Sequence, residues 1–155
     1  MSSSLHSILA VLHALTGAVW LGAMCYSFFI LHPRAHTFFT KEADFESFIA
    51  TVSRGARWKV LGALGLIALS GAGLVVVRWP DPFSVTWLVL IGLKAALLIA
   101  AVGLFVYVSW RLWPARLFAT PEEIGHFQRT FRRVAIVMMT LAALGMTLGI
   151  LSHTG

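Results

Sequence analysis

Two ionisable side chains of this chain fall inside long apolar stretches, and both carry nitrogen atoms that can bind a metal. His13 lies in the stretch that begins near Leu5, and Lys94 lies in the stretch that begins near Val85. Ionisable groups are costly inside a membrane and usually serve a function there. Neutral imidazole is a good ligand for copper and for haem iron. We therefore place a candidate site at His13 and Lys94.

Counting residues predicts that these two groups lie at the same depth. At 1.5 Å per residue, His13 lies about 12 Å and Lys94 about 13 Å from the same outer face of a membrane. His6, His13 and Trp20 are spaced by seven residues, so they share one face of a helix. His153 ends the last apolar stretch on the side where His6 begins the first. We predict that His6, His13 and His153 are metal ligands, with His6 and His153 on the entry side.

Simpler interpretations of the same residues stay open. His13 can be hydrogen-bonded to a neighbouring helix, and Lys94 can extend its amine to the outer interface. Cys25 and the scattered methionines are interpreted as packing residues. The sequence has no CxxC pair, no His-rich or Met-rich loop, and no nucleotide-binding, hydrolase or zinc-protease motif.

The elements that position these residues follow from composition. The 155 residues are 59% hydrophobic and 12% charged, whereas soluble domains carry about 25% charged residues. Four apolar runs are near the roughly 20 residues that cross a membrane, at about 5–31, 60–77, 85–108 and 134–151. Spans of this length should be helical, so we predict an all-α integral membrane protein. It would be one membrane domain, 1–155, folded as a four-helix antiparallel up-and-down bundle. No convincing internal repeat is visible.

The segments between the spans add two further helix predictions. Residues of about 41–57 place apolar side chains at helical spacing among charges, which predicts a short interfacial helix. Pro33 and Arg34 are expected to end the first span, and the residues from Trp79 to Pro82 should form a stiff turn. The string Thr-Pro-Glu-Glu from Thr120 predicts a helix start that continues into the fourth span.

Basic residues predict the orientation. The first and third loops hold ten of the twelve Lys and Arg side chains, so the positive-inside rule places both loops in the cytoplasm and both termini outside. This distribution suits the anionic head groups of a lipid bilayer better than nucleic acid. We expect a bacterial-type inner membrane.

A few residues resemble a known family. His13 is followed by Trp20 and Gly22, a basic residue (Arg57) precedes the second span, and Ser70-Gly71 and Lys94 come later. This pattern resembles the membrane domain of the copper-resistance protein D (CopD) family. It is also distantly similar to the HemJ-type membrane proteins, which are haem-associated protoporphyrinogen oxidases.

The resemblance implies a site lined by His13, Trp20 and Lys94. The leading hypothesis is a CopD-like protein that binds copper or haem b in the outer half of the bundle. It would handle copper or carry electrons rather than catalyse a reaction by itself. Two alternatives are a haem-linked oxidase of the HemJ type and an accessory subunit of a larger membrane complex. A homo-oligomer is also compatible with the sequence.

Overall fold

The computed structural model describes the backbone of residues 2–78 and 84–154, and the side chains of 4–78, 84–120 and 122–151. Its elements are all helical: α1 (Ser2–Tyr26), η1 (Ser27–Leu31), α2 (His32–Phe38), α3 (Glu42–Val52), α4 (Ala56–Arg78), α5 (Val85–Tyr107), η2 (Val108–Leu112), α6 (Trp113–Leu117) and α7 (Pro121–Thr154). The expected turn at 79–82 lies outside the described residues.

Four continuous helical stretches are long and apolar enough to cross a membrane: Ser4–Phe38, Ala56–Arg78, Val85–Leu117 and Glu122–Leu151. Each contains one of the four predicted spans. The all-α fold, the four membrane helices and the short helix between the first two spans are therefore confirmed.

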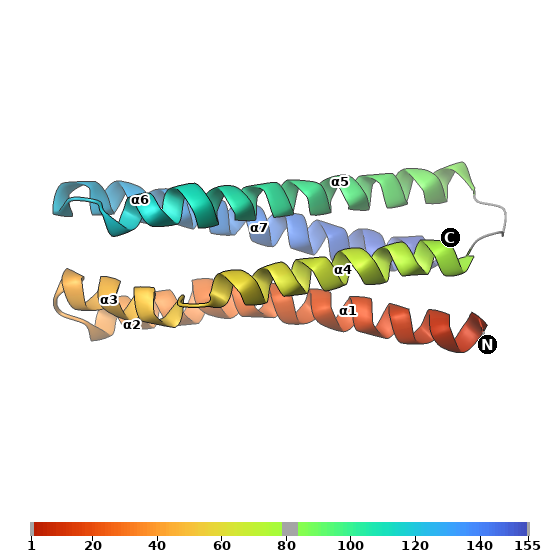
Figure 1. The fold of residues 1–155 in the computed structure, drawn as a ribbon, viewed down its shortest axis with the longest axis horizontal. Coiled ribbons are helices and arrows are strands. Elements are labelled where there is room, and N and C mark those ends of the chain that lie inside the picture. Colours follow the sequence, from red (N-terminus) through yellow and green to blue (C-terminus); the bar gives the residue numbers. More distant parts are fainter. Residues whose placement is uncertain (1, 79–83, 155) are drawn as a thin grey trace.

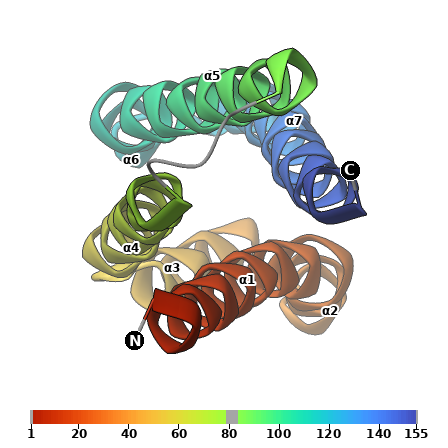
Figure 2. The same cartoon turned by 90° about the vertical axis from the view of Figure 1, so that its right-hand side faces the viewer.

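The four long helices form an up-and-down bundle (Figure 1). The start of α1 and the end of α7 lie together at one end, which we call the terminal end. Helices α2, α3 and α6 lie at the opposite end, which we call the basic end. The view along the bundle (Figure 2) shows α1 beside α4, and α5 beside α7. These two pairs make the most extensive helix contacts of the fold.

The centre of the bundle is a small apolar core to which every long helix contributes. Its buried residues are Trp20 of α1, Leu64 of α4, Ala101 of α5, and Met138 and Ala142 of α7. Most other aliphatic side chains face outward; Leu69, for example, is 74% exposed and Ile99 is 71% exposed. An apolar exterior of this kind is stable in hydrocarbon rather than in water.

Two of the membrane helices each combine a π-helical turn with a proline. Segment η1 ends at Leu31, directly before His32-Pro33, and η2 ends at Leu112, directly before Trp113-Pro114. The backbone N–H of His32 bonds to the Ser27 carbonyl, five residues back, and so the helix is widened where the proline would otherwise clash with the preceding turn. The prediction that Pro33 ends the first helix was wrong, because the π turn lets the helix continue to Phe38.

The two connecting segments at the basic end begin new helices. The predicted interfacial helix is α3, shorter than expected, because the chain turns at Gly55 with a positive φ of 76°. Helix α7 begins as predicted and runs without a break into the fourth span. The Glu123 carboxylate accepts hydrogen bonds from the Thr120 backbone N–H (3.0 Å) and hydroxyl (3.2 Å), which caps the helix start.

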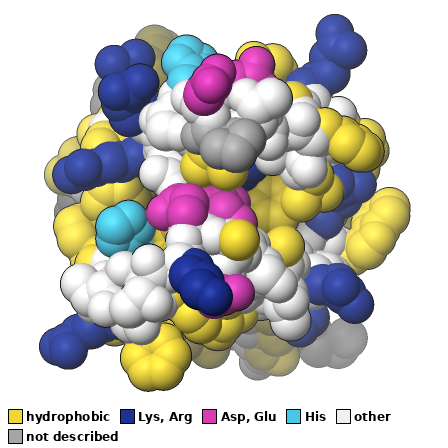
Figure 3. All heavy atoms as spheres, turned by 90° about the vertical axis from the view of Figure 1, so that its left-hand side faces the viewer, with side chains coloured by type: hydrophobic (Ala, Val, Ile, Leu, Met, Phe, Trp, Pro, Cys, Tyr) yellow, Lys and Arg dark blue, Asp and Glu magenta, His cyan; other side chains and the backbone are white. Residues whose placement is uncertain are grey.

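The basic end concentrates the charged side chains of the protein. Figure 3 shows most Lys and Arg side chains around the edge of this face, and Asp and Glu side chains both at its centre and near the top of the view. Beneath them, Phe45 and Ile49 of α3 are buried against Ala35 of α2 and contact Trp113 of α6. Helix α3 therefore covers this end of the bundle.

Candidate functional site

His13 is held in a fixed orientation by the neighbouring helix α4. Its Nδ1 atom lies 3.0 Å from the Ile67 carbonyl oxygen and 3.0 Å from Ser70 Oγ. The Ser70 hydroxyl donates its single proton to the Leu66 carbonyl at 2.6 Å, so toward His13 it acts as an acceptor. Both contacts therefore require a proton on Nδ1 of His13. The neutral ring then carries its free electron pair on Nε2, which is the atom available to a ligand.

The sequence of α4 leaves room for this ring. A Cβ atom added at Gly71 would lie 3.1 Å from His13 Cε1, and one added at Gly73 would lie 3.1 Å from a methyl carbon of Leu9. Both distances are tighter than ordinary van der Waals contacts. Helices α1 and α4 thus approach closely because α4 presents glycine at these positions, as is common between membrane helices. Ser70 is buried, with 2% of its surface exposed.

Lys94 approaches the site from the other pair of helices. It is half-buried on α5, and a Cβ atom added at Gly149 of α7 would lie 3.9 Å from both Cε and Nζ of the lysine. The two residues singled out from the sequence therefore lie against different helices, His13 against α4 and Lys94 against α7.

The other predicted site residues lie further away or outside the described side chains. Trp20 lies seven residues after His13, about 10 Å along the helix axis, and is packed in the central core with 8% of its surface exposed. His6 is half-buried two turns before His13 and has an interaction partner. The side chain of His153, in the last turn of α7, lies outside the described residues.

The ligand set offered by the described side chains is small. Among them, no group of three or more His, Cys, Asp and Glu is placed to hold a metal ion. The Cys25 thiol lies 3.9 Å from the Met139 sulfur, on the α1–α7 contact. A haem iron needs only one or two protein ligands, such as a histidine. Among the described side chains, His13 is a histidine of this kind.

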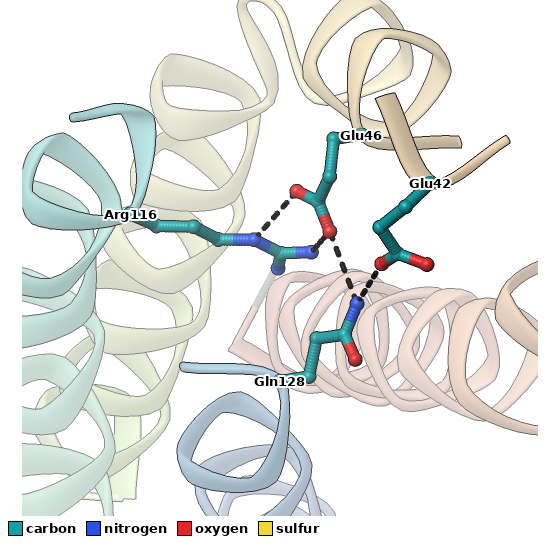
Figure 4. A network of polar contacts seen from close by, with 4 residues as sticks. All are labelled: Glu42, Glu46, Arg116 and Gln128. Atoms are coloured by element: carbon teal, nitrogen blue, oxygen red, sulfur yellow. Dashed lines mark hydrogen bonds and ion pairs between the residues drawn. The ribbon is translucent and has the colours of Figure 1, made fainter. Parts of the chain in front are cut away.

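A second polar cluster, at the basic end, was not predicted from the sequence. Arg116 of α6 has 7% of its surface exposed and pairs with Glu46 of α3 through two contacts, Nε to Oε2 at 2.9 Å and Nη2 to Oε1 at 2.6 Å. The Gln128 side-chain amide of α7 donates to both Glu42 and Glu46 (Figure 4). The guanidinium also lies over the Phe131 ring, 5.1 Å from its centroid. This cluster joins α3, α6 and α7 at the basic end.

A further contact joins α4 to the π-helical segment η2. The Trp113 N–H bonds to the Val108 carbonyl, and Pro114 has no N–H to donate, so neither residue gives the Ser109 carbonyl a donor. Arg57 of α4 supplies one, with Nη2 at 2.6 Å. Its guanidinium also lies 4.5 Å from the centroid of the Trp110 ring. Buried carbonyl groups need such partners in a membrane.

The only sign of these contacts in the sequence is the presence of acids and arginines in the loops. Their presence does not indicate which acid pairs with which arginine. Glu46 and Arg116 are separated by 70 residues.

Comparison of the chain with protein-family models, with curated proteins and with solved structures finds no match.

Proposed function

We propose that this chain is a membrane protein that binds a metal centre, haem b or copper, between His13 and Lys94. Its role would be electron transfer or copper handling. The membrane would be a bacterial-type inner membrane, with the terminal end outside and the basic end in the cytoplasm, as the distribution of basic residues indicates. The resemblance of the sequence to CopD-like membrane domains agrees with this proposal.

The observation that carries the proposal is the hydrogen-bonded state of His13. Metal-binding histidines almost always donate their second ring N–H to a carbonyl or carboxylate, which fixes the tautomer and the ring orientation. His13 does so through Nδ1, toward Ile67 and Ser70. A histidine used only for packing could make the same bonds, but then no second charged group would be needed nearby. Lys94 would be such a group, at the level that residue counting predicts.

The residues of the site would have distinct roles. His13 would be the principal ligand through Nε2, with Ser70 and the Ile67 carbonyl holding its ring in place. Lys94 would be a second ligand or would neutralise an anionic group such as a haem propionate. A bound haem would supply an iron that accepts and donates single electrons. The apolar side chains around the site would keep water away from it and so influence the reduction potential.

The test is the cofactor content of the purified protein. We expect wild-type protein to carry haem, seen as a Soret absorption band, or copper, seen by elemental analysis. His13→Ala should reduce the cofactor content by about tenfold or more, because it removes a ligand. His126→Ala is a matched control, since that histidine is exposed at the start of α7. Unchanged cofactor content in His13→Ala would rule out His13 as the ligand. Wild-type protein with neither haem nor copper, but with stoichiometric partner proteins, would favour an accessory subunit instead.

The proposed orientation has its own test. A cysteine placed at Lys41, exposed at the basic end, should react with a membrane-impermeant maleimide in inside-out vesicles but not in intact cells. The parent for this experiment would carry Cys25→Ala. Labelling in intact cells would show that the basic end lies outside, which contradicts the proposed orientation.

A further inference from the structure

The chain contains a structural repeat that its sequence conceals. Residues 2–38 form an α-helix, a five-residue π segment and a short proline-containing helix, and residues 85–117 form the same series. The π segments begin at Ser27 and Val108, 81 positions apart. The two prolines, Pro33 and Pro114, have the same separation. Two unusual features thus recur together at one spacing.

Burial follows the same spacing. At an offset of 81, buried Trp20 corresponds to buried Ala101, and buried Ala35 corresponds to buried Arg116. Identical residues also occur at this offset: Leu9 and Leu90, Leu12 and Leu93, Ala14 and Ala95, Gly22 and Gly103, Tyr26 and Tyr107, and Leu31 and Leu112. The equivalence therefore covers core positions as well as helix boundaries.

The helices that follow, α4 and α7, correspond in the same way. Helix α1 packs mainly on α4, and α5 packs mainly on α7. At an offset of 78, buried Leu64 corresponds to buried Ala142. In Figure 2, a half-turn about the bundle axis brings α1 onto the place of α5 and α4 onto the place of α7. The fold is thus two helix pairs related by an approximate two-fold axis along the bundle.

The candidate site obeys this symmetry. His13 and Lys94 are 81 positions apart, and each lies against a glycine of the helix paired with its own. His13 lies against Gly71 and Lys94 against Gly149, and these glycines are 78 positions apart, the same offset that relates the buried residues of α4 and α7. The two ionisable side chains therefore occupy equivalent places in the two helix pairs.

We infer that the candidate site consists of two equivalent half-sites, His13 with Gly71 and Lys94 with Gly149, and that the ligand lies on the approximate two-fold axis between them. The identity of the ligand rests on the proposed function, whereas the equivalence of the half-sites does not. The donor nitrogens then come one from each helix pair and meet the ligand from opposite sides. Exchanging the two side chains should therefore reproduce the site, rotated by a half-turn about that axis.

One difference between the half-sites must be corrected in such an exchange. Ser70, which accepts a hydrogen bond from His13, corresponds to Leu148 at the offset of 78. The Leu148 side chain has no polar atom for an imidazole at position 94. The carbonyl of Gly145 occupies the position equivalent to that of Ile67. The complete exchange is thus His13→Lys, Lys94→His and Leu148→Ser.

The experiment compares His13→Lys, the pair Lys94→His with Leu148→Ser, and all three changes together in the full-length protein. His13→Lys places two like charges at one level of the bundle, which repel in a medium of low dielectric constant. We expect it to lower the unfolding midpoint in detergent and to lose about tenfold or more of the bound cofactor. The complete exchange should recover the midpoint and bring cofactor content to within about twofold of wild type.

The recovery is measured as the non-additivity of the two sets of changes. If the losses in unfolding midpoint and cofactor content of the two sets of changes simply add, or if the complete exchange loses more than their sum, the half-sites are not equivalent. A wild-type protein without cofactor would remove the proposed function, and the unfolding midpoints alone would then decide on the repeat. Recovered stability without recovered cofactor binding would overturn the inference that the ligand lies on the axis.

Discussion

The ion pair of Glu46 and Arg116 offers the most direct test of how the helices of the basic end are held together. Replacing Glu46 by glutamine keeps the size of the side chain but removes its charge. The Arg116 guanidinium, whose side chain is 5% exposed, would then be a buried charge with a neutral partner. Glutamine can still accept one hydrogen bond through its amide oxygen, so only one of the two contacts at 2.6 and 2.9 Å can be replaced.

The expected loss of stability follows from this geometry. Breaking a buried ion pair by removing one partner costs about 3–5 kcal/mol. The Glu46 side chain is 21% exposed, so solvent screens part of the interaction and the lower limit applies. We expect Glu46→Gln to reduce the free energy of unfolding by about 3 kcal/mol, which changes the unfolding equilibrium constant by about two orders of magnitude.

The measurement is reversible unfolding of the purified protein in mixed micelles with rising denaturing detergent, followed by circular dichroism. Asp44→Asn is the matched control, because Asp44 is exposed on the same helix; its effect should stay within about 0.5 kcal/mol. The double variant Glu46→Leu with Arg116→Leu should lie within about 1 kcal/mol of wild type, since apolar replacement of a buried pair is often neutral. A loss for Glu46→Gln no larger than that for Asp44→Asn would refute the reasoning.

Two further substitutions test the other contacts between helices. Gly71→Ala places a Cβ atom 3.1 Å from His13 Cε1, so we expect a loss of about 1–3 kcal/mol from overpacking, together with reduced cofactor content. The control Gly62→Ala, with nothing within 4 Å of its new Cβ, should be neutral or stabilising; equal effects of the two changes would contradict the tight fit at His13. Arg57→Met leaves the Ser109 carbonyl without the donor at 2.6 Å and should cost about 1.5–3 kcal/mol in the same unfolding assay. Lys59→Met, at an exposed position of the same helix, should change little, and a similar cost for both would show that the Ser109 contact is not the cause.

The sequence predicted the membrane helices well because their formation depends on local composition. Length and apolarity decide whether a segment crosses hydrocarbon, and no partner needs to be known for that. Depth along a helix is also a local quantity, so counting residues predicts the same level for His13 and Lys94.

The parts that sequence reasoning missed depend on distant partners or on departures from ideal helix geometry. Pro33 was expected to end a helix because prolines normally do, and only the π turn before it shows why the helix continues. The pair of Glu46 and Arg116 joins loops whose relative position is set by the whole bundle. The repeat was hidden because the two halves share few identical residues, whereas their helix boundaries and burial agree.

The π turns before Pro33 and Pro114 also determine how these helices tolerate changes of length. A π turn holds one residue more than an α-helical turn, so deleting one residue inside it would restore regular α-helix and leave the faces on both sides aligned. The same deletion elsewhere in either helix would rotate everything beyond it by about 100°. In α5, such a deletion would turn Arg116 away from Glu46. The regular helix would, however, then bring the proline ring against the preceding turn. A one-residue deletion in either segment should therefore be accepted only when its proline is replaced as well.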